Sequence, residues 1–308
     1  MAAPTGTSDA PFGRMLTAMV TPFTDDGSVD YDAARRLAAY LVDEQRNDGI
    51  VVSGTTGESP TTGDDEKERL LRAVVEAVGD RATVVAGAGT NDTRHSVELA
   101  RTAERAGAHG LLLVTPYYSK PPQEGIYRHF VTVADATALP VMLYDIPGRS
   151  GVPIMSGTLA RLARHERIVA VKDAKGDLYE GSQVIASTGL AYYSGDDAFN
   201  LPWLSVGAVG CVSVIGHVVG AEIAAMIEAY RAGDVAGALA IHRRLLPVIS
   251  GIMMQAGGAI MAKAALGMVG RPVGPVRPPL AEATGEQLTR LREDLIAGGV
   301  KPSDEVVT

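Results

Sequence analysis

The stretch that decides the fold is IVAVKDAKGD, residues 168–177, in which a short apolar run ends in a lysine, an aspartate and a glycine-containing turn. Apolar residues on both faces of such a run are typical of a strand in a parallel sheet, which is covered on both sides. The chain repeats the pattern eight times, at 16–23, 49–54, 82–89, 110–115, 140–145, 168–174, 190–195 and 210–215. These runs predict a buried parallel sheet of the α/β class.

Amphipathic segments of helical length separate the runs. The clearest are 31–45, 64–79 and 92–107, where apolar residues recur at spacings of three and four. Strands that alternate with helices imply parallel pairing and right-handed crossovers, and eight such units match a (β/α)8 TIM barrel. A doubly wound open sheet is the competing architecture, but GAGTND at 87–92 lacks the third glycine of the dinucleotide-binding fingerprint.

Strand-like runs stop after Gly220, and helix-like segments with glycine and proline breaks follow. We therefore predict a flexible N-terminus at 1–12, a barrel at 13–232, a C-terminal helical region at 233–299 and a tail at 300–308. The uncharged stretch 198–221 is long enough to cross a bilayer, but its glycines and its strand-like centre favour a buried strand and helix. The first ten residues lack the basic and apolar regions of a secretory signal, so we expect none.

Composition limits the partners and the compartment. The 308 residues are 46% hydrophobic, which suffices for a large core, and the net charge is −8. This charge argues against nucleic acid or an anionic membrane as the main partner. Cys211 is the only cysteine and stands in an apolar run, so we expect a small buried side chain. One thiol excludes an internal disulfide and favours a cytoplasmic location.

Lys172 is the most unusual residue of the opening stretch. Strict alternation puts two sets of side chains on opposite faces of the strand: Ile168, Ala170, Lys172 and Ala174 on one, and Val169, Val171 and Asp173 on the other. The smaller residues suit the barrel interior, so Lys172 is expected to point inward. Burial disfavours an ammonium, and an amine that attacks a ketone must be neutral. Lys172 is the candidate nucleophile; the alternative is a strand-end lysine that reaches water.

Other polar residues follow the strands at the rim where barrel enzymes have their active sites. Schiff-base chemistry needs a group that carries protons, and Tyr144 ends the neighbouring strand. Tyr117 and Tyr118 follow the fourth strand. Thr55 and Thr56, between two glycines, offer hydroxyls and backbone N–H groups that suit a carboxylate. The ordinary alternatives are packed aromatic rings for the tyrosines and local turn bonds for the threonines.

Arg149 lies in a loop between Gly148 and Ser150, where a guanidinium suits bidentate capture of a carboxylate. A solvated surface arginine is the alternative. Other chemistries fit poorly, because the chain has no GxxxxGK[ST] phosphate loop and no HExxH sequence. Its six histidines lie far apart, without metal-ligand spacing.

Five motifs occur in series: GTTGES (54–59), TPYYSKPPQEGIYRHF (115–130), LYDIPGRSG (143–151), VKDAKGD (171–177) and YYSGDD (192–197). In this order and spacing they resemble the dihydrodipicolinate synthases, within the pyruvate-dependent class I aldolase and N-acetylneuraminate lyase superfamily. The resemblance runs from about residue 15 to about residue 299. It implies an enzyme that condenses pyruvate with L-aspartate 4-semialdehyde on the route to diaminopimelate and lysine, with no metal or organic cofactor.

The resemblance also implies a role for each matching residue. Lys172 forms the Schiff base with pyruvate, Tyr144 relays protons beside it with Thr55 and Tyr118, Thr56 holds the pyruvate carboxylate, Arg149 receives the carboxylate of the semialdehyde, and Gly195 and Val212 lie near the amine. The Tyr118 counterpart is donated across a subunit interface. A tight homodimer, and commonly a homotetramer built from two such dimers, is therefore implied.

Lysine-inhibited relatives bind lysine at the tight dimer interface. Ser59, Asn91 and Tyr117 match that allosteric site, whereas its histidine positions read Asp64 and Lys67 and its glutamate position reads His95. We therefore expect weak or absent inhibition by lysine.

Two other functions stay open. The first is an aldolase of the same superfamily that acts on a sugar-acid keto substrate, although such enzymes generally lack an arginine at the position of Arg149. The second is a barrel that has lost catalysis and only binds a ligand. The joint presence of Lys172, Tyr144, Thr55 and Tyr118 argues against it.

Overall fold

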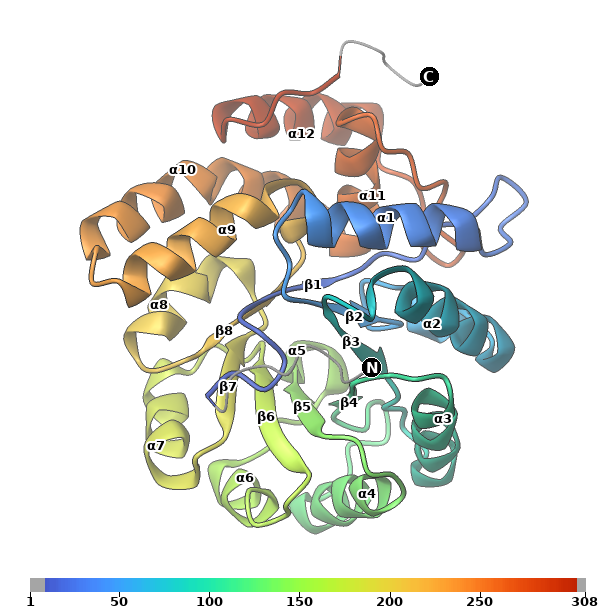
Figure 1. Cartoon of the computed structure of the whole chain (residues 1–308), viewed down its shortest axis with the longest axis vertical. Coiled ribbons are helices and arrows are strands. Elements are labelled where there is room, and N and C mark those ends of the chain that lie inside the picture. Colours follow the sequence, from blue (N-terminus) through green and yellow to red (C-terminus); the bar gives the residue numbers. More distant parts are fainter. Residues whose placement is uncertain (1–8, 304–308) are drawn as a thin grey trace.

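The strands close into a parallel barrel in sequence order (Figure 1), in a computed structural model that describes residues 9–303. Their bounds are β1 Met15–Ala18, β2 Gly49–Val52, β3 Thr83–Gly87, β4 Gly110–Val114, β5 Val141–Asp145, β6 Ile168–Asp173, β7 Ala191–Ser194 and β8 Gly210–Ser213. The ring closes between β1 and β8, with Leu16 opposite Val212. The predicted (β/α)8 barrel is confirmed, and the open doubly wound sheet is excluded.

Alternate side chains of the strands fill the barrel interior. This inner cluster consists of Phe12, Leu16, Ala18, Val51, Val85, Leu112, Met142, Tyr144, Ala170, Tyr193 and Val212. The side chains between them, such as Val171, belong to the outer core beneath the helices. Phe12 and Tyr193 lie together at the N-terminal end of the interior, where the Tyr193 hydroxyl donates to the Gly13 carbonyl at 2.9 Å.

The predicted alternation along β6 is correct from Ala170 onward and wrong at the start of the strand. The pairing with β5 shifts there: Val141 lies opposite Ile168, but Met142 lies opposite Ala170. The extra residue is a β-bulge, which reverses the order of inward and outward side chains on one side of it. Ile168 therefore packs in the outer core, and Val169 packs against the inner cluster.

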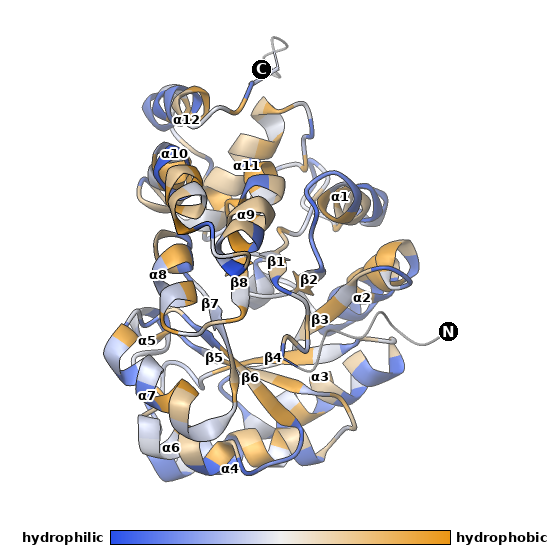
Figure 2. Cartoon of the chain, turned by 60° about the vertical axis from the view of Figure 1, so that its left-hand side comes forward, coloured by the Kyte–Doolittle hydropathy of each residue, from blue (hydrophilic) through white to orange (hydrophobic). Residues whose placement is uncertain are grey.

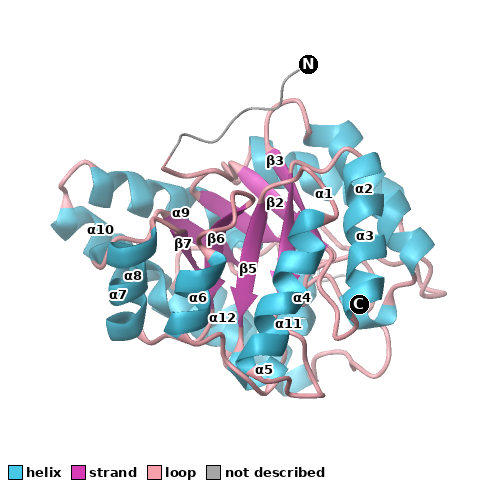
Figure 3. Cartoon of the chain, turned by 90° about the horizontal axis from the view of Figure 1, so that it is seen from below, coloured by secondary structure: helices cyan, strands magenta, loops and turns pink. Residues whose placement is uncertain are grey.

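Helices cover the outside of the barrel (Figure 3). Their bounds are α1 Tyr31–Asp43, α2 Asp64–Val78, α3 Thr93–Arg105, α4 Gln123–Asp135, α5 Pro147–Ser150, α6 Ser156–Leu162, α7 Leu178–Thr188, α8 Asn200–Ser205 and α9 Gly216–Arg231, with 3-10 turns at Ser59–Thr61 and Asp197–Phe199. Several starts are capped by aspartate side chains, as at α1, where Asp30 accepts from the Ala33 N–H. Trp203 of α8 is fully buried, with its ring centroid 5.5 Å from that of Tyr192.

Three helices, α10 (Val235–Met253), α11 (Gly258–Met268) and α12 (Gly285–Ala297), form the C-terminal region on one side of the barrel (Figure 1). Figure 2 shows α11 as mostly apolar, as expected for a helix enclosed by its neighbours. Within residues 9–303, α10 is long and apolar enough to cross a membrane by length and composition. It packs against α9 and α12, and it carries Arg243 and Arg244 in its middle.

The stretch 198–221 contains α8, β8 and the start of α9, so the predicted buried strand and helix are confirmed. At the N-terminus, residues 1–8 of the segment predicted to be flexible lie outside the described residues, as do residues 304–308 of the predicted tail. Ala10 and Phe12, also within that N-terminal segment, are buried.

Candidate active site

Lys172 and Tyr144 lie side by side at the carboxyl ends of β6 and β5. They are opposite each other in the strand register, and the Lys172 Nζ lies 4.1 Å from the centre of the Tyr144 ring. Each side chain is only 4% exposed. Within residues 9–303, the Lys172 amine makes no hydrogen bond or ion pair to another side chain or carbonyl. The structure thus places an unpaired amine beside a phenol, at the inner face predicted from the sequence.

Gly195 lies against the lysine stem, and Val212 lies in the barrel interior. Val212 belongs to the inner cluster on β8. Gly195 follows β7, and its N–H donates to the Asp173 carbonyl at 2.7 Å. A Cβ at this position would lie 3.0 Å from the Lys172 Cγ, which is closer than a normal contact. A glycine here therefore leaves the lysine side chain room to lie against the backbone.

The loop after β2 presents Thr55 and Thr56. Residues 53 and 58, on either side, have left-handed φ angles of 57° and 56°, so the chain turns sharply at both ends of the segment. Inside it, the Thr21 hydroxyl donates to the Gly57 carbonyl at 2.6 Å. In the part of the chain that the structure describes, the hydroxyls and backbone N–H groups of Thr55 and Thr56 have no protein acceptor. These four donors are available to a ligand.

Tyr118 is not brought to Lys172 within one chain. It is 89% exposed and has a φ of 72°, a conformation that costs a bulky residue free energy. Its neighbour Tyr117 is half-buried. The single chain thus leaves one of the four predicted catalytic side chains directed into solvent.

Arg149 lies in the short helix α5, directly beyond the carboxyl end of β5, rather than in the predicted loop. Its side chain is exposed. The segment that carries it is attached to the end of β5, because the Asp145 Oδ1 accepts from the Ile154 N–H at 3.1 Å. The Ser150 hydroxyl adds a bond to the Val152 carbonyl at 2.8 Å. Arg149 is therefore an exposed cation on a hydrogen-bonded segment at the rim.

Sequence reasoning missed a group of buried charges behind the rim. Lys175 lies 2.6 Å from the Glu180 Oε2 and 3.7 Å from the Asp145 Oδ2. Burial raises the pKa of Asp145 to about 7 and also raises the pKa of Asp173. Although burial opposes it, the neighbouring carboxylates raise the pKa of Lys175. Lys175 is thus a paired cation, unlike Lys172. The position of Asp145, one residue past Tyr144, was the signal for an outward-facing buried side chain.

The residues that match the allosteric site lie apart from the amine. Ser59 begins the 3-10 turn after β2, and Asn91 is exposed. His95 is bonded to Asp64, with 2.8 Å between its Nε2 and the Oδ2 of that carboxylate. Lys67 reaches the same carboxylate at 3.8 Å. Polar side chains of this chain thus contact one another at the positions where the resemblance expects lysine ligands.

Cys211 is buried in the outer core, as predicted, and burial raises the pKa of its thiol. Among residues 9–303 there is no group of three His, Cys, Asp or Glu side chains placed to hold a metal ion.

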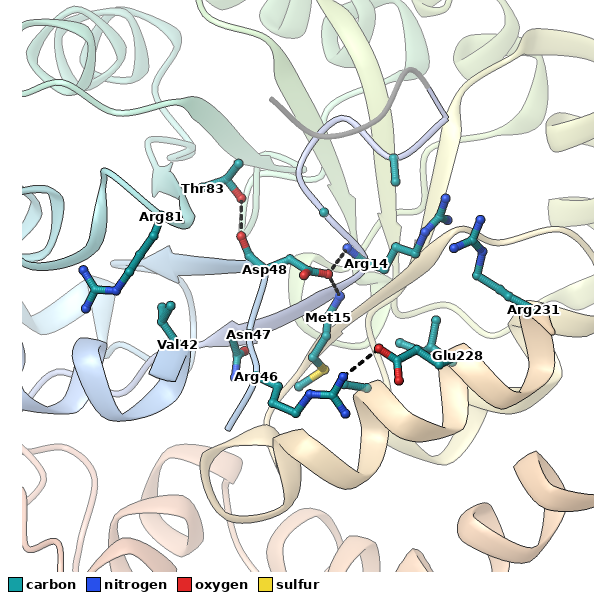
Figure 4. Close-up of a pocket in the computed structure, with 14 residues that line it drawn as sticks. Arg14, Met15, Val42, Arg46, Asn47, Asp48, Arg81, Thr83, Glu228 and Arg231 are labelled. Carbon is teal, nitrogen blue, oxygen red and sulfur yellow. Dashed lines mark hydrogen bonds and ion pairs between the residues drawn. The ribbon is translucent and has the colours of Figure 1, made fainter. Parts of the chain in front are cut away.

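A cleft of about 560 Å³ lies at the opposite end of the barrel (Figure 4). Met15, which begins β1, and Asp48, which precedes β2, line it. The Asp48 carboxylate accepts from the backbone N–H groups of Arg14 and Met15 at 2.7 and 3.0 Å, and Arg46 pairs with Glu228 at 2.7 Å. The cleft contains none of the predicted site residues. Its polar groups join β1, the loop before β2 and α9, which indicates a structural role.

A closed parallel barrel with a buried amine and phenol at its carboxyl rim defines an enzyme of the Schiff-base-forming lyase and synthase class. The sequence pattern of the dihydrodipicolinate synthetase family matches residues 11–297, and the chain belongs to this family. A 4-hydroxy-tetrahydrodipicolinate synthase of Acidothermus cellulolyticus is 69% identical over 290 residues, which cover 94% of each chain.

Solved structures agree with this assignment. A dihydrodipicolinate synthase from Cyanidioschyzon merolae with lysine bound has a TM-score of 0.91 and 44% identity, over 94% of this chain and 98% of that chain. The enzyme from Acinetobacter baumannii, solved in complex with pyruvate, has a TM-score of 0.90 and 34% identity, over 94% of this chain and 99% of that chain. The function expected from the sequence, synthesis of 4-hydroxy-tetrahydrodipicolinate, is thereby confirmed over the sugar-acid aldolase and the inactive barrel.

Proposed function

We propose that Lys172 is the residue that forms the Schiff base, and that its partner is pyruvate. The observation that carries this proposal is the unpaired, buried amine 4.1 Å from the centre of the Tyr144 ring. The amine attacks the C2 carbonyl of pyruvate, and the carbinolamine loses water to give the imine. A proton then leaves the methyl carbon, and the resulting enamine is the carbon nucleophile.

Tyr144 carries the protons of these steps. It stands near the carboxyl end of β5, and its ring lies against the amine that changes protonation during carbinolamine formation. We propose that Thr55 and Tyr118 complete a relay between this phenol and solvent. A relay suits the site because Tyr144 is almost fully buried, so that its proton needs a chain of hydroxyls to reach water.

Two carboxylates have to be held, one on each substrate. The free donors of Thr56, which is itself buried, suit the carboxylate of pyruvate. The exposed guanidinium of Arg149 suits the carboxylate of L-aspartate 4-semialdehyde, which arrives second and from outside. Gly195 and Val212 shape the wall around the imine.

The remaining steps balance without another reactant. The enamine carbon bonds to the aldehyde carbon of the semialdehyde, and the aldehyde oxygen takes a proton to become a hydroxyl. The amine of the semialdehyde then attacks the imine carbon and displaces the Lys172 amine. The products are 4-hydroxy-tetrahydrodipicolinate and one water, the molecule lost when the imine formed.

We also propose that the enzyme is a homotetramer built from two tight dimers, and that Tyr118 enters the active site of the partner subunit. The exposure of Tyr118 and its left-handed backbone support this, because a strained, solvent-directed tyrosine has no use within one chain. A cytoplasmic location is a further proposal, supported by the single buried cysteine, which is compatible with reducing conditions.

Borohydride reduction in the presence of pyruvate tests the central proposal. We expect one reduced pyruvate per chain, located on the peptide that contains Lys172, and no adduct in the Lys172→Ala variant. The variant should lose at least about a thousandfold in kcat/KM. Lys301→Ala, which removes an exposed lysine, is the matched control and should trap pyruvate normally. An adduct on another lysine, or full activity in Lys172→Ala, contradicts the proposal.

A further inference from the structure

Glu58 lies in the loop that presents Thr55 and Thr56, yet its side chain is buried and points away from any solvent. It is 2% exposed, and its φ of 56° is left-handed. Its carboxylate meets the C-terminal region: the Oε1 lies 2.7 Å from the Nζ of Lys263 in α11, and the Oε2 accepts from the Arg277 N–H at 2.8 Å. A buried ion pair thus joins the β2 loop to a helix more than 200 residues away in sequence.

Lys263 is held at this place by other groups as well. It is 5% exposed, its Nζ donates to the Pro275 carbonyl at 2.6 Å, and the Nζ lies 4.2 Å from the centre of the Phe23 ring. The apolar stem of Lys263 could pack on this mostly apolar helix without these polar partners of its amine. The amine is directed to Glu58, with which it forms a buried ion pair.

Arg277 adds a second attachment to the same loop. Its guanidinium makes bonds of 2.6 and 2.8 Å to the Glu66 carboxylate and donates to the Thr61 carbonyl at 2.7 Å. The C-terminal region therefore contacts the segment 58–66 at three residues, Glu58, Thr61 and Glu66. We name the Glu58–Lys263 pair with the Arg277 contacts the loop clasp.

We infer that the loop clasp positions the threonine donors for the pyruvate carboxylate, so that Glu58 and Lys263 are positioning residues of the reaction. The inference rests on the proposed function. Glu58 is two residues from Thr56, and the Glu58 N–H donates to the Thr55 carbonyl at 3.1 Å. The side chain that fixes the left-handed turn therefore also fixes the peptide units that carry both threonines.

The geometry specifies which kinetic constant should change. Breaking a buried pair leaves an uncompensated charge, and the surrounding segment moves to hydrate it. Here that segment is the β2 loop, whose free donors are the ones proposed to hold pyruvate, whereas the segment that carries Arg149 is fixed separately through Asp145 and Ile154. The affinity for pyruvate should therefore fall, and the response to the semialdehyde should change little.

The test uses three variants: Lys263→Met, Glu58→Gln and the double variant that carries both of these changes. Arg271→Met is the control. Arg271 is the matched control, because it joins the C-terminal region to Glu44 of α1 at 2.7 Å without touching the β2 loop. We expect Lys263→Met to raise the KM for pyruvate about tenfold and to change the KM for the semialdehyde less than about twofold. Glu58→Gln keeps an acceptor for Arg277 and should have a smaller effect.

Removing both charges should restore part of the loss, because no unpaired carboxylate remains, so the double variant should bind pyruvate better than Lys263→Met. Arg271→Met should match the wild type. The inference is overturned if a folded, correctly assembled Lys263→Met or Glu58→Gln variant keeps the wild-type KM for pyruvate, or if both substrates and kcat are affected equally. If Lys263→Met does not fold, Glu58→Gln decides. Borohydride trapping on the wild type separates these outcomes from failure of the proposed Schiff base.

Discussion

Gly195 leaves the space in which the Lys172 side chain lies, so a single methyl group there should disturb the proposed nucleophile. In Gly195→Ala the new Cβ would meet the Lys172 Cγ and the Asp173 carbonyl oxygen, each at 3.0 Å. We expect kcat/KM to fall by about ten- to a hundredfold, because a shift of the amine of well under an ångström spoils its approach to the ketone. Steady-state kinetics on the purified variant measure this.

The matched control is Gly157→Ala on α6, where a Cβ meets nothing within 4 Å. It should retain wild-type kinetics. Unchanged kcat/KM in a folded Gly195→Ala variant would show that the lysine stem has room that the structure does not give it.

Asp145 should give the stability a recognisable pH dependence. Burial raises its pKa to about 7, while an unfolded aspartate titrates near 3.9. Between these values the folded protein holds a proton that the unfolded chain has lost, so this carboxyl lowers the free energy of unfolding as the pH rises from about 4 to about 7. Asp145→Asn cannot titrate, yet it keeps an oxygen that can accept from the Ile154 N–H.

Relative to the wild type, the free energy of unfolding of Asp145→Asn should therefore increase between pH 5.5 and pH 7.5, by about 1 to 2 kcal/mol. Urea denaturation followed by circular dichroism at the two pH values measures the difference. A difference that stays constant or decreases with pH would mean that Asp145 is already ionised at the lower pH.

Buried carboxylates such as Asp145 and Glu58 mark the limit of prediction at this scale. The motifs place both residues at the rim, and the inward orientation of Lys172, the proposed nucleophile, follows from its strand position. The outward direction of Asp145 follows from its position next to Tyr144, whereas the direction of Glu58 depends on a left-handed turn that has no sequence signal here.

At the scale of elements, eight apolar runs and the helices between them suffice to predict the barrel, because each run is buried on both faces. The bulge in β6 was not predictable, since strict alternation assumes an uninterrupted pleat. The predicted inward direction of Lys172 is still correct, because the bulge precedes Ala170. The alternation of side chains is therefore as predicted over the second half of the strand. Helix α5 was missed because four residues are too few for a periodic pattern.

The segment after β4 leads to a test of the proposed shared site. If Tyr118 serves the partner subunit, chains with Lys172→Ala and chains with Tyr118→Phe should complement each other. A dimer of the two contains one site that has both side chains intact. Random mixing of equal amounts should restore about a quarter of the wild-type activity, because half of the dimers are mixed and each has one working site.

Activity should be measured after co-expression and purification of the mixture, with each variant alone as the control. Activity equal to the mean of the two separate variants would place Tyr118 in the site of its own chain.

At the scale of the whole molecule, we expect the enzyme to respond weakly to lysine. The Asp64–His95 and Asp64–Lys67 contacts occupy the positions where the resemblance expects lysine ligands. A cationic ligand would have to displace Lys67, whose amine also donates to the Thr62 carbonyl at 2.8 Å. Initial rates at increasing lysine concentration should show half inhibition only above about 1 mM lysine. This corresponds to a binding free energy of about 4 kcal/mol or less.

Lys67→His is an informative companion variant, because it restores the residue type that the resemblance expects at one position. Half inhibition of the unmodified enzyme well below millimolar lysine would contradict the expectation.

The attachment of the C-terminal region to the β2 loop could not be predicted from the sequence. Glu58 and Lys263 are separated by most of the chain, and their ion pair joins two regions that the sequence presents as independent.

Trp203 has a practical consequence. It is the sole indole in the chain, and it lies enclosed in α8 on the outer side of the barrel. Its intrinsic emission should therefore shift to longer wavelength only when this outer layer opens to water. No tryptophan is among the proposed substrate-contacting residues. The fluorescence of Trp203 therefore reports on the opening of the outer layer without an added label.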